Sequence, residues 1–263
     1  MPQVAIADGE IHYEVAGRGD PLILVSGLNG VARYWEPQLA GFSARYRVIT
    51  YDQRGTGASD HRQREFSVDR MTNELVALMD ALKIARAHIV GLSTGGAIGQ
   101  TLAIEHPARV ARLVLVSTWT HCDPWFRRLF EARRRMYEVA GPELHAMFHP
   151  LFLYPPDYVN AHDAEIAEEQ NRAPTKSAPV AASIGRIDAL LKFDRRAGLQ
   201  CIKAPTLIVA GDNDYITPSY HAAALAQAIP GSKLVVFRGG GHSLSKTRAA
   251  EFNQTVLDFL GPN

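Results

Sequence analysis

Short apolar runs alternate along this chain with stretches of helical periodicity, and this alternation restricts the folds that the chain can adopt. The first two runs, residues 4–7 and 11–15, are separated by Asp8-Gly9-Glu10 and predict a hairpin. The later runs are continuous, as is typical of strands buried on both faces of a parallel sheet. These runs are residues 21–26, 47–52, 87–93, 112–117, 206–211 and 233–237. Their order predicts an α/β fold, with a mostly parallel sheet covered by helices on both faces.

One helix between these runs has a clear start and a clear face. Ser67 is a residue type that caps helix starts, and the apolar residues after it recur at spacings of three and four. These residues are Val68, Met71, Leu75, Leu78, Met79 and Leu82. We expect this face to pack into the core.

The alternation stops between about residues 119 and 200. Residues 126–141 and 163–170 have helical character, residues 149–158 are rich in aromatic residues and proline, and no buried strand is evident. Strands resume at Thr206. We therefore expect a single α/β domain over residues 1–263, with residues 119–200 inserted within it as a helical cap over the sheet.

The charge balance argues against nucleic-acid and membrane partners. The chain has 28 Lys and Arg against 27 Asp and Glu, a net charge of +1, whereas proteins that bind such partners usually carry a basic excess. No stretch has the roughly 20 apolar residues that a membrane span needs, and the N-terminal residues lack a signal-peptide pattern. Cys122 and Cys201 lie far apart and suit a reducing compartment. We expect a cytoplasmic protein, either a monomer or a homodimer.

The segment Gly91-Leu92-Ser93-Thr94-Gly95 carries the first chemical signal. It follows a predicted strand and precedes a predicted helix, the setting in which G-x-S-x-G lifts a nucleophilic serine out of a strained turn. The free N–H groups of the helix start would then face a developing oxyanion. The alternative is a pair of glycines that merely lets the helix pack closely on the sheet.

Downstream residues favour the catalytic interpretation. An acid and then a histidine should follow later strands in that order. Asp212 and Asp214 follow the strand at residues 206–211, and His242 follows the strand at residues 233–237. Asp214 is favoured as the acid because it lies farther along the loop, whereas Asp212 directly follows Gly211 and suits a turn cap. We expect Ser93, His242 and Asp214 to act as nucleophile, base and acid.

A second N–H for an oxyanion hole should come from the loop after an earlier strand. The loop Ser26-Gly27-Leu28-Asn29-Gly30 has this position, and Leu28 N–H would pair with Thr94 N–H. An ordinary glycine turn is the alternative. Ser26 itself is discounted as a nucleophile because it has neither the G-x-S-x-G pattern nor a following helix.

With these residues placed, the chain resembles the α/β-hydrolase-fold serine hydrolases over nearly its whole length. Ser93, Asp214 and His242 match the triad positions of that family, and residues 51–57, YDQRGTG, match its loop after the next strand. Many members have His-Gly where this chain has Ser26-Gly27, a departure that alters the pocket wall. The motifs VSGLNG, YWEPQL, YDQRGTG and HPLFLYPPDY are most similar to the aminoacrylate (carbamate-type) hydrolases of uracil degradation, and next to the 3-oxoadipate enol-lactonases. The resemblance implies a small, acidic, amide-like or enamine-like substrate.

The substrate pocket should lie between the cap and the triad. We expect Asn29, Trp119, Phe152 and Tyr154 to line it, although aromatic residues in such segments often only pack the cap against the sheet. Arg133-Arg134-Arg135 could offer a cation to a substrate carboxylate, but such a run is more often a solvated helix face.

The resulting hypothesis is hydrolysis of a small-molecule ester, amide, carbamate or enamine-type substrate through an acyl-enzyme. The alternatives on the same fold are an enol-lactonase, a carbon–carbon hydrolase, a lyase, a cofactor-free perhydrolase, and a slow-turnover ligand receptor. Haloalkane dehalogenases and epoxide hydrolases are disfavoured because they use aspartate in place of Ser93. A nucleotide-binding oxidoreductase is disfavoured because no G-x-G-x-x-G or P-loop pattern is complete. No residues have metal-ligand spacing, so we expect neither metal nor cofactor.

Overall fold

The computed structural model describes residues 2–7, 9–62, 65–176 and 178–261. Within them, one eight-stranded sheet has the order β1-β2-β4-β3-β5-β6-β7-β8. The pairs β1–β2 and β2–β4 are antiparallel, and the other neighbouring pairs are parallel. The strands are β1 (Gln3–Ile6), β2 (Gly9–Ala16), β3 (Pro21–Val25), β4 (Arg47–Tyr51), β5 (Ala87–Leu92), β6 (Val110–Val116), β7 (Thr206–Gly211) and β8 (Lys233–Phe237).

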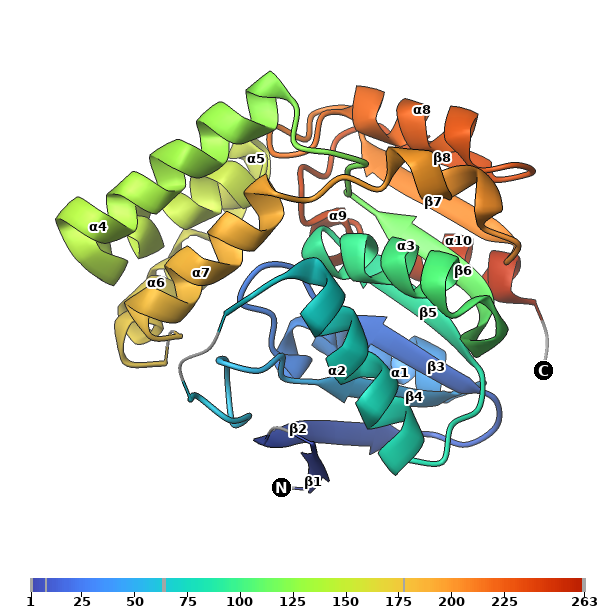
Figure 1. Cartoon of the computed structure of the whole chain (residues 1–263). Helices are drawn as coiled ribbons and strands as arrows, with labels where there is room; N and C mark the ends of the chain where they lie inside the picture. The colour runs from blue at the N-terminus through green and yellow to red at the C-terminus, as the bar shows by residue number, and fades with distance from the viewer. Residues whose placement is uncertain (1, 8, 63–64, 177, 262–263) are drawn as a thin grey trace.

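Helices cover both faces of this sheet (Figure 1). The α-helices are α1 (Glu36–Ser43), α2 (Val68–Ala81), α3 (Thr94–Glu105), α4 (Pro124–Leu153), α5 (Pro156–Ala161), α6 (Asp163–Lys176), α7 (Val180–Leu191), α8 (Ser219–Ala228), α9 (Leu244–Thr247) and α10 (Ala249–Leu260). Three short 3₁₀ helices are also described, η1 (Ala32–Trp35), η2 (Pro107–Arg109) and η3 (Arg196–Cys201). Among the described residues, no helix has the length and apolar character to cross a bilayer.

Alternate residues of the central strands build two separate cores. In β3, Ile23 and Val25 belong to the cluster that includes α2, α3 and α8, whereas Leu22 and Leu24 belong to the cluster with α1 and α10. A strand can serve two cores in this way because its successive side chains point to opposite faces. The predicted α/β fold, with a mostly parallel sheet and helices on both faces, is confirmed.

The predicted helix after Ser67 is also present. The Ser67 side chain accepts a hydrogen bond from Arg70 N–H at 3.0 Å, and the predicted apolar residues are buried through Met79. Leu82 lies just beyond the last helical residue, Ala81.

One strand prediction is wrong in its burial. Residues 233–237 form β8, but Leu234 and Val236 are 39% and 46% exposed. The reason is position, because β8 is the last strand of the sheet and pairs only with β7. Apolar residues alone did not distinguish this edge strand from a central one.

Between β6 and β7, the described residues form α4, α5, α6 and α7 and no named strand. We call α4–α7, Pro124 to Leu191, the inserted helices. They gather on one side of the sheet in Figure 1. The longest, α4, is broken at Gly141, whose φ of 72° is left-handed, and Pro142 follows the break. The two halves pack together, with the rings of Tyr137 and His145 stacked 4.1 Å apart.

The loop after β4 is held by one buried carboxylate. Asp52 Oδ1 accepts the Ala32 N–H at 2.7 Å, and Oδ2 accepts the Ala58 N–H at 2.8 Å. His12 Nδ1 lies 3.0 Å from the same Oδ2. Asp52 therefore ties together β2, the segment before α1 and its own loop.

Replacing this carboxylate should destabilise the fold. We expect Asp52→Ala to lower the free energy of unfolding by about 3 kcal/mol, because buried N–H groups lose their acceptor. Urea denaturation followed by circular dichroism measures the change. Asp20→Ala is the control, since Asp20 is exposed. Equal stabilities for the two variants would contradict the role given to Asp52.

Candidate active site

Ser93 occupies a strained junction between β5 and α3. Its φ of 53° and ψ of −115° lie outside the regions that residues with a Cβ usually adopt. Its N–H donates to Val116 O at 2.8 Å, and its carbonyl accepts the Thr118 hydroxyl at 2.8 Å. Hydrogen bonds from β6 and the loop after it therefore hold the turn in place.

The glycines on either side of Ser93 meet backbone, not side chains. A Cβ on Gly91 would lie 2.2 Å from Gly95 O, and a Cβ on Gly95 would lie 2.0 Å from Val25 O. Backbone cannot move aside as a flexible side chain can. Both glycines are therefore needed for the start of α3 to approach the ends of β3 and β5.

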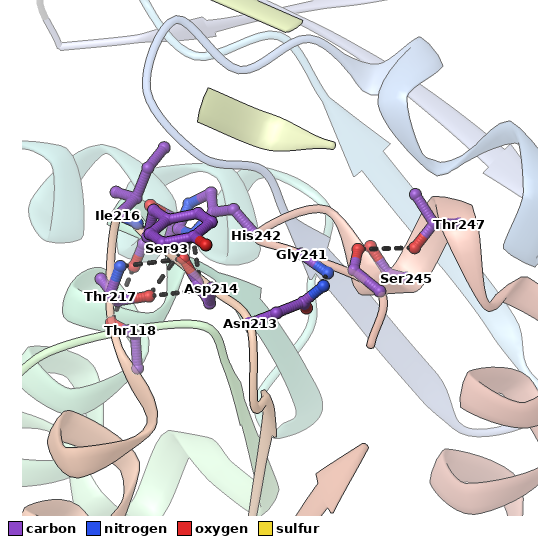
Figure 2. A network of polar contacts seen from close by, with 12 residues as sticks. Ser93, Thr118, Asn213, Asp214, Ile216, Thr217, Gly241, His242, Ser245 and Thr247 are labelled. Atoms are coloured by element: carbon purple, nitrogen blue, oxygen red, sulfur yellow. Dashed lines mark hydrogen bonds and ion pairs between the residues drawn. The ribbon is translucent and has the colours of Figure 1, made fainter. Parts of the chain in front are cut away.

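His242 and Asp214 form a buried pair on the neighbouring loops. His242 Nδ1 lies 2.9 Å from Asp214 Oδ2 and 3.1 Å from Oδ1. Asp214 also accepts the N–H groups of Ile216 and Thr217 and the Thr217 hydroxyl. Figure 2 shows this network beside Ser93.

Asp214 is ionised despite its burial. Burial acts to raise the pKa of Asp214, but the charge of His242, its hydrogen bond, and the donors of Thr217 outweigh that effect. The pKa of Asp214 consequently lies below its usual value. A carboxylate held in this state can fix one imidazole tautomer, with Nδ1–H directed at the carboxylate and the Nε2 lone pair free.

Asp212 and Asn213, in the same loop as Asp214, form hydrogen bonds to the loop that carries His242. Asp212 Oδ1 accepts Gly239 N–H at 2.7 Å, and Asn213 Oδ1 accepts Gly241 N–H at 2.8 Å. Of the two candidate acids, Asp214 lies against His242 and Asp212 fastens the loop that carries His242.

Ser93 and His242 line one cavity of about 210 Å³. Leu28 and Asn29 line it from the loop after β3. Among the described residues, no group accepts a hydrogen bond from Leu28 N–H or Thr94 N–H. Asn29 is anchored by a 3.1 Å bond from its Nδ2 to Ser183 Oγ on α7.

The aromatic residues predicted for the pocket lie elsewhere. Trp119 is fully buried and stacks on Phe126 with ring centroids 4.4 Å apart, outside the described lining of the cavity. Phe152 packs against the core and is likewise outside that lining. Tyr154 lines a larger adjoining cavity of about 470 Å³, where its hydroxyl accepts a 3.2 Å bond from Lys246 Nζ.

Sequence reasoning missed Phe130 and His149 around the cavity, and it considered Arg133 only within a run of arginines that is more often a solvated helix face. Phe130 and Arg133 from the first half of α4 and His149 from its second half face the space that Ser93 and His242 line. Thr118 and Thr217 were also missed as supports of Ser93 and Asp214. The available signal was helical spacing, because Phe126, Phe130, Arg133 and Tyr137 are separated by steps of three and four, and all four are buried.

Comparison with known proteins identifies the family. A model of the α/β hydrolase fold matches residues 20–249. The chain belongs to this family.

Relatives of the chain within the α/β hydrolases match it almost end to end. A protein of Azorhizobium caulinodans named "Putative carbamate hydrolase RutD" is 35% identical over 261 residues, 99% of this chain and 98% of that protein. A protein of the same name from Variovorax paradoxus is 39% identical over 254 residues, 95% and 96% of the two chains. The crystal structure of the enol-lactonase from Burkholderia xenovorans has a TM-score of 0.91 and 29% identity, covering 98% of this chain and 99% of its own. The chain is a hydrolase, and the predicted resemblance to these two groups is confirmed.

Gly95, at the start of α3, allows a test of the tight turn at Ser93. We expect Gly95→Ala to lower the free energy of unfolding by about 3 kcal/mol, because the new methyl group would overlap Val25 O. Thermal and urea unfolding measure the change.

Gly41→Ala is the matched control. Gly41 lies within α1, and the nearest atom to an added Cβ is 3.7 Å away. Alanine there should be neutral or stabilising by up to about 1 kcal/mol. If Gly95→Ala were as stable as Gly41→Ala, the close approach of α3 to Val25 O would not constrain the turn at Ser93.

Proposed function

We propose that this hydrolase cleaves a small ester, amide, carbamate or enamine-type substrate through an acyl-enzyme on Ser93. One observation carries the proposal. Ser93 sits in a strained turn and lines the same cavity as His242, whose Nδ1 is bonded to a buried, ionised Asp214. The site thus contains a candidate nucleophile, a candidate base and a candidate orienting acid.

Acylation begins with attack of Ser93 Oγ on the substrate carbonyl carbon. His242 Nε2 takes the hydroxyl proton as the new carbon–oxygen bond forms. The bond to the leaving group then breaks, and the leaving group receives that proton from His242. Asp214 stabilises the imidazolium between these two transfers and remains ionised throughout.

Deacylation repeats the sequence with water. His242 Nε2 takes a proton from water as its oxygen attacks the acyl carbon. The bond between that carbon and Ser93 Oγ breaks, and the proton returns to Ser93. The product acid leaves, and the enzyme regains its starting state.

The N–H groups of Leu28 and Thr94 would hold the oxyanion during both steps. Their lack of acceptors among the described residues supports this role, as does the position of Thr94 at the first turn of α3. Loss of one such donor typically lowers turnover by about 10²–10³-fold.

We further propose that the inserted helices act as a cap. Phe130, Arg133 and His149 contribute to the cavity that Ser93 lines, and Leu153 O accepts Ser243 N–H at 3.1 Å beside His242. The relatives named as carbamate hydrolases and the enol-lactonase neighbour favour a small acyl compound as substrate.

The nucleophile can be tested by covalent labelling. A fluorophosphonate should form a bond from Ser93 Oγ to phosphorus with loss of fluoride and a proton. We expect intact mass spectrometry to find a single adduct on the wild type and none on Ser93→Ala. An adduct on both proteins would exclude Ser93 as the nucleophile, and no adduct on folded wild type would favour the ligand-receptor alternative.

The acid can be tested with the two aspartates of one loop. We expect Asp214→Asn to lower kcat for 4-nitrophenyl acetate by about 10⁴-fold, because the amide cannot hold the required tautomer of His242. Asp212→Asn should stay within about threefold of wild type, since its amide oxygen can still accept Gly239 N–H. Comparable losses in both variants would refute the assignment of Asp214.

A further inference from the structure

The loop after β3, residues 26–30, lies directly against the candidate nucleophile. A Cβ on Gly27 would lie 3.4 Å from Ser93 Cβ and 3.9 Å from Ser93 Oγ. Leu28 and Asn29 come next in the loop and line the cavity of about 210 Å³ beside Ser93. The position of Leu28 N–H relative to Ser93 therefore depends on what holds these two residues.

The two ends of this loop are fastened to the loop after β4. Gln53 Nε2 donates to Ser26 O at 2.7 Å, and Gln53 N–H donates to Gly30 O at 3.1 Å. The Thr56 hydroxyl also lies within hydrogen-bonding distance of Gly30 O, at 2.8 Å. Among the described residues, the backbone N–H and C=O groups of positions 28 and 29 have no hydrogen-bond partner. The middle of the loop consequently lacks the backbone hydrogen bonds that hold its ends.

The middle of the loop is bonded to the inserted helices instead. Asn29 Nδ2 donates to the hydroxyl of Ser183 at 3.1 Å, and Ser183 is fully buried on α7. Tyr137 on α4 takes part in the same network, since hydrogen bonds with Ser183 and Asn29 act to lower the pKa of its hydroxyl, which burial raises. Leu28 adds apolar packing. One side chain thus joins the loop beside Ser93 to two helices that follow much later in the sequence.

The backbone of Asn29 adds a second requirement at this position. Its φ of 57° is left-handed, a conformation that glycine adopts at least cost and that asparagine visits more often than other residues with a Cβ. A glycine would make the turn but would have no group to bond Ser183. Asn29 therefore supplies both the left-handed turn and a side-chain donor.

Other contacts than this hydrogen bond hold α7 against the rest of the molecule. Arg186, three residues after Ser183, donates from Nη1 to Arg54 O at 2.9 Å. A Cβ on Gly185 would lie 2.9 Å from the ring of Phe66, so the helix packs closely on that residue. Loss of the Ser183 hydroxyl should therefore free the middle of the loop without displacing α7.

We propose that Asn29 is a positioning residue, whose hydrogen bond to Ser183 holds Leu28 N–H in place for the oxyanion; this inference rests on the proposed function. An oxyanion donor is effective when it is fixed in position before the charge develops. The acceptor that fixes this donor belongs to α7. Turnover thus depends on the seating of α7, although α7 contributes no reacting group.

A double-mutant cycle in the intact chain tests this role. Ser183→Ala removes the acceptor, and Asn29→Gly removes the donor while permitting a left-handed backbone. We expect each change to lower kcat/KM for 4-nitrophenyl acetate by about 30-fold, because a misplaced oxyanion donor is partly lost. The double variant should lose no more than either single variant, because both changes remove the same hydrogen bond.

Asp188→Asn is the matched control on α7. It breaks the ion pair of Asp188 with Arg134, which joins α7 to α4 and does not involve the loop. Asp188 is 40% exposed, and we expect the variant to stay within about threefold of wild-type kcat/KM.

A transition-state analogue gives a readout that a merely structural role would not change. Ser93 Oγ adds to the carbonyl carbon of 1,1,1-trifluorobutan-2-one, the carbonyl oxygen becomes the oxyanion, and His242 takes the serine proton. Butan-2-one, which is not activated, binds without this addition. We expect Ser183→Ala and Asn29→Gly to raise the inhibition constant of the trifluoroketone by about 30-fold and that of butan-2-one by less than about threefold.

Labelling with the fluorophosphonate to completion counts the competent sites, and rates are expressed per labelled site. Wild-type activity in Ser183→Ala would overturn the inference, as would a double variant whose loss equals the product of the two single losses. Equal rises for the two ketones, or a loss in Asp188→Asn as large as in Ser183→Ala, would indicate general loosening and also overturn it. Failure to label folded wild type would instead overturn the proposed function on which the inference rests.

Discussion

The approach of α3 to the ends of β3 and β5 is the constraint on which this molecule depends. The first turn of α3 lies so close to Val25 O that position 95 has no room for a Cβ, and position 91 has none because of Gly95 O. This contact forces Ser93 into its left-handed conformation. The same contact leaves Thr94 N–H in the first turn of α3, directly after Ser93 in the chain. The proposed nucleophile and the proposed oxyanion donor therefore both depend on one packing arrangement.

The second half of the site depends on loops that hold one another. Asp212 and Asn213 accept backbone N–H groups from the segment that leads to His242. These hydrogen bonds between the two loops help to fix the distance between Asp214 and His242, in addition to the hydrogen bond of the pair itself. Thr217 supplies both its N–H and its hydroxyl to Asp214. Because these donors stabilise the carboxylate form, the negative charge of Asp214 survives burial. The loops after β7 and β8 therefore place an ionised Asp214 against His242, which lines the same cavity as Ser93.

Local patterns in the sequence predicted the sheet, the α2 face, and the positions of Ser93, Asp214 and His242, because each depends on residues close to it in the chain. The glycines around Ser93 are a local signature of a tight turn, and the strand order places later loops at the same edge of the sheet. The surroundings of Trp119 could not be predicted in that way. Its burial against Phe126 and Phe193 depends on how the inserted helices fold back, which no short motif records. The exposure of β8 similarly depends on the absence of a neighbour beyond it in the described sheet.

The run Arg133-Arg134-Arg135 shows that residue type alone does not predict which side chains are buried. Three consecutive arginines suggest a solvated face, yet successive helix positions point about 100° apart, so one of three can be buried while its neighbours pair with Glu138 and Asp188. Arg133 shares its side of α4 with Phe126, Phe130 and Tyr137, which are all buried. A cation on an apolar face opposes folding, and native chains keep such a conflict chiefly where function requires it. Ser93, which lines the same cavity, also departs from local preference, because its φ of 53° is left-handed. Strain at Ser93 and the buried charge of Arg133 are therefore two local costs at one cavity of about 210 Å³.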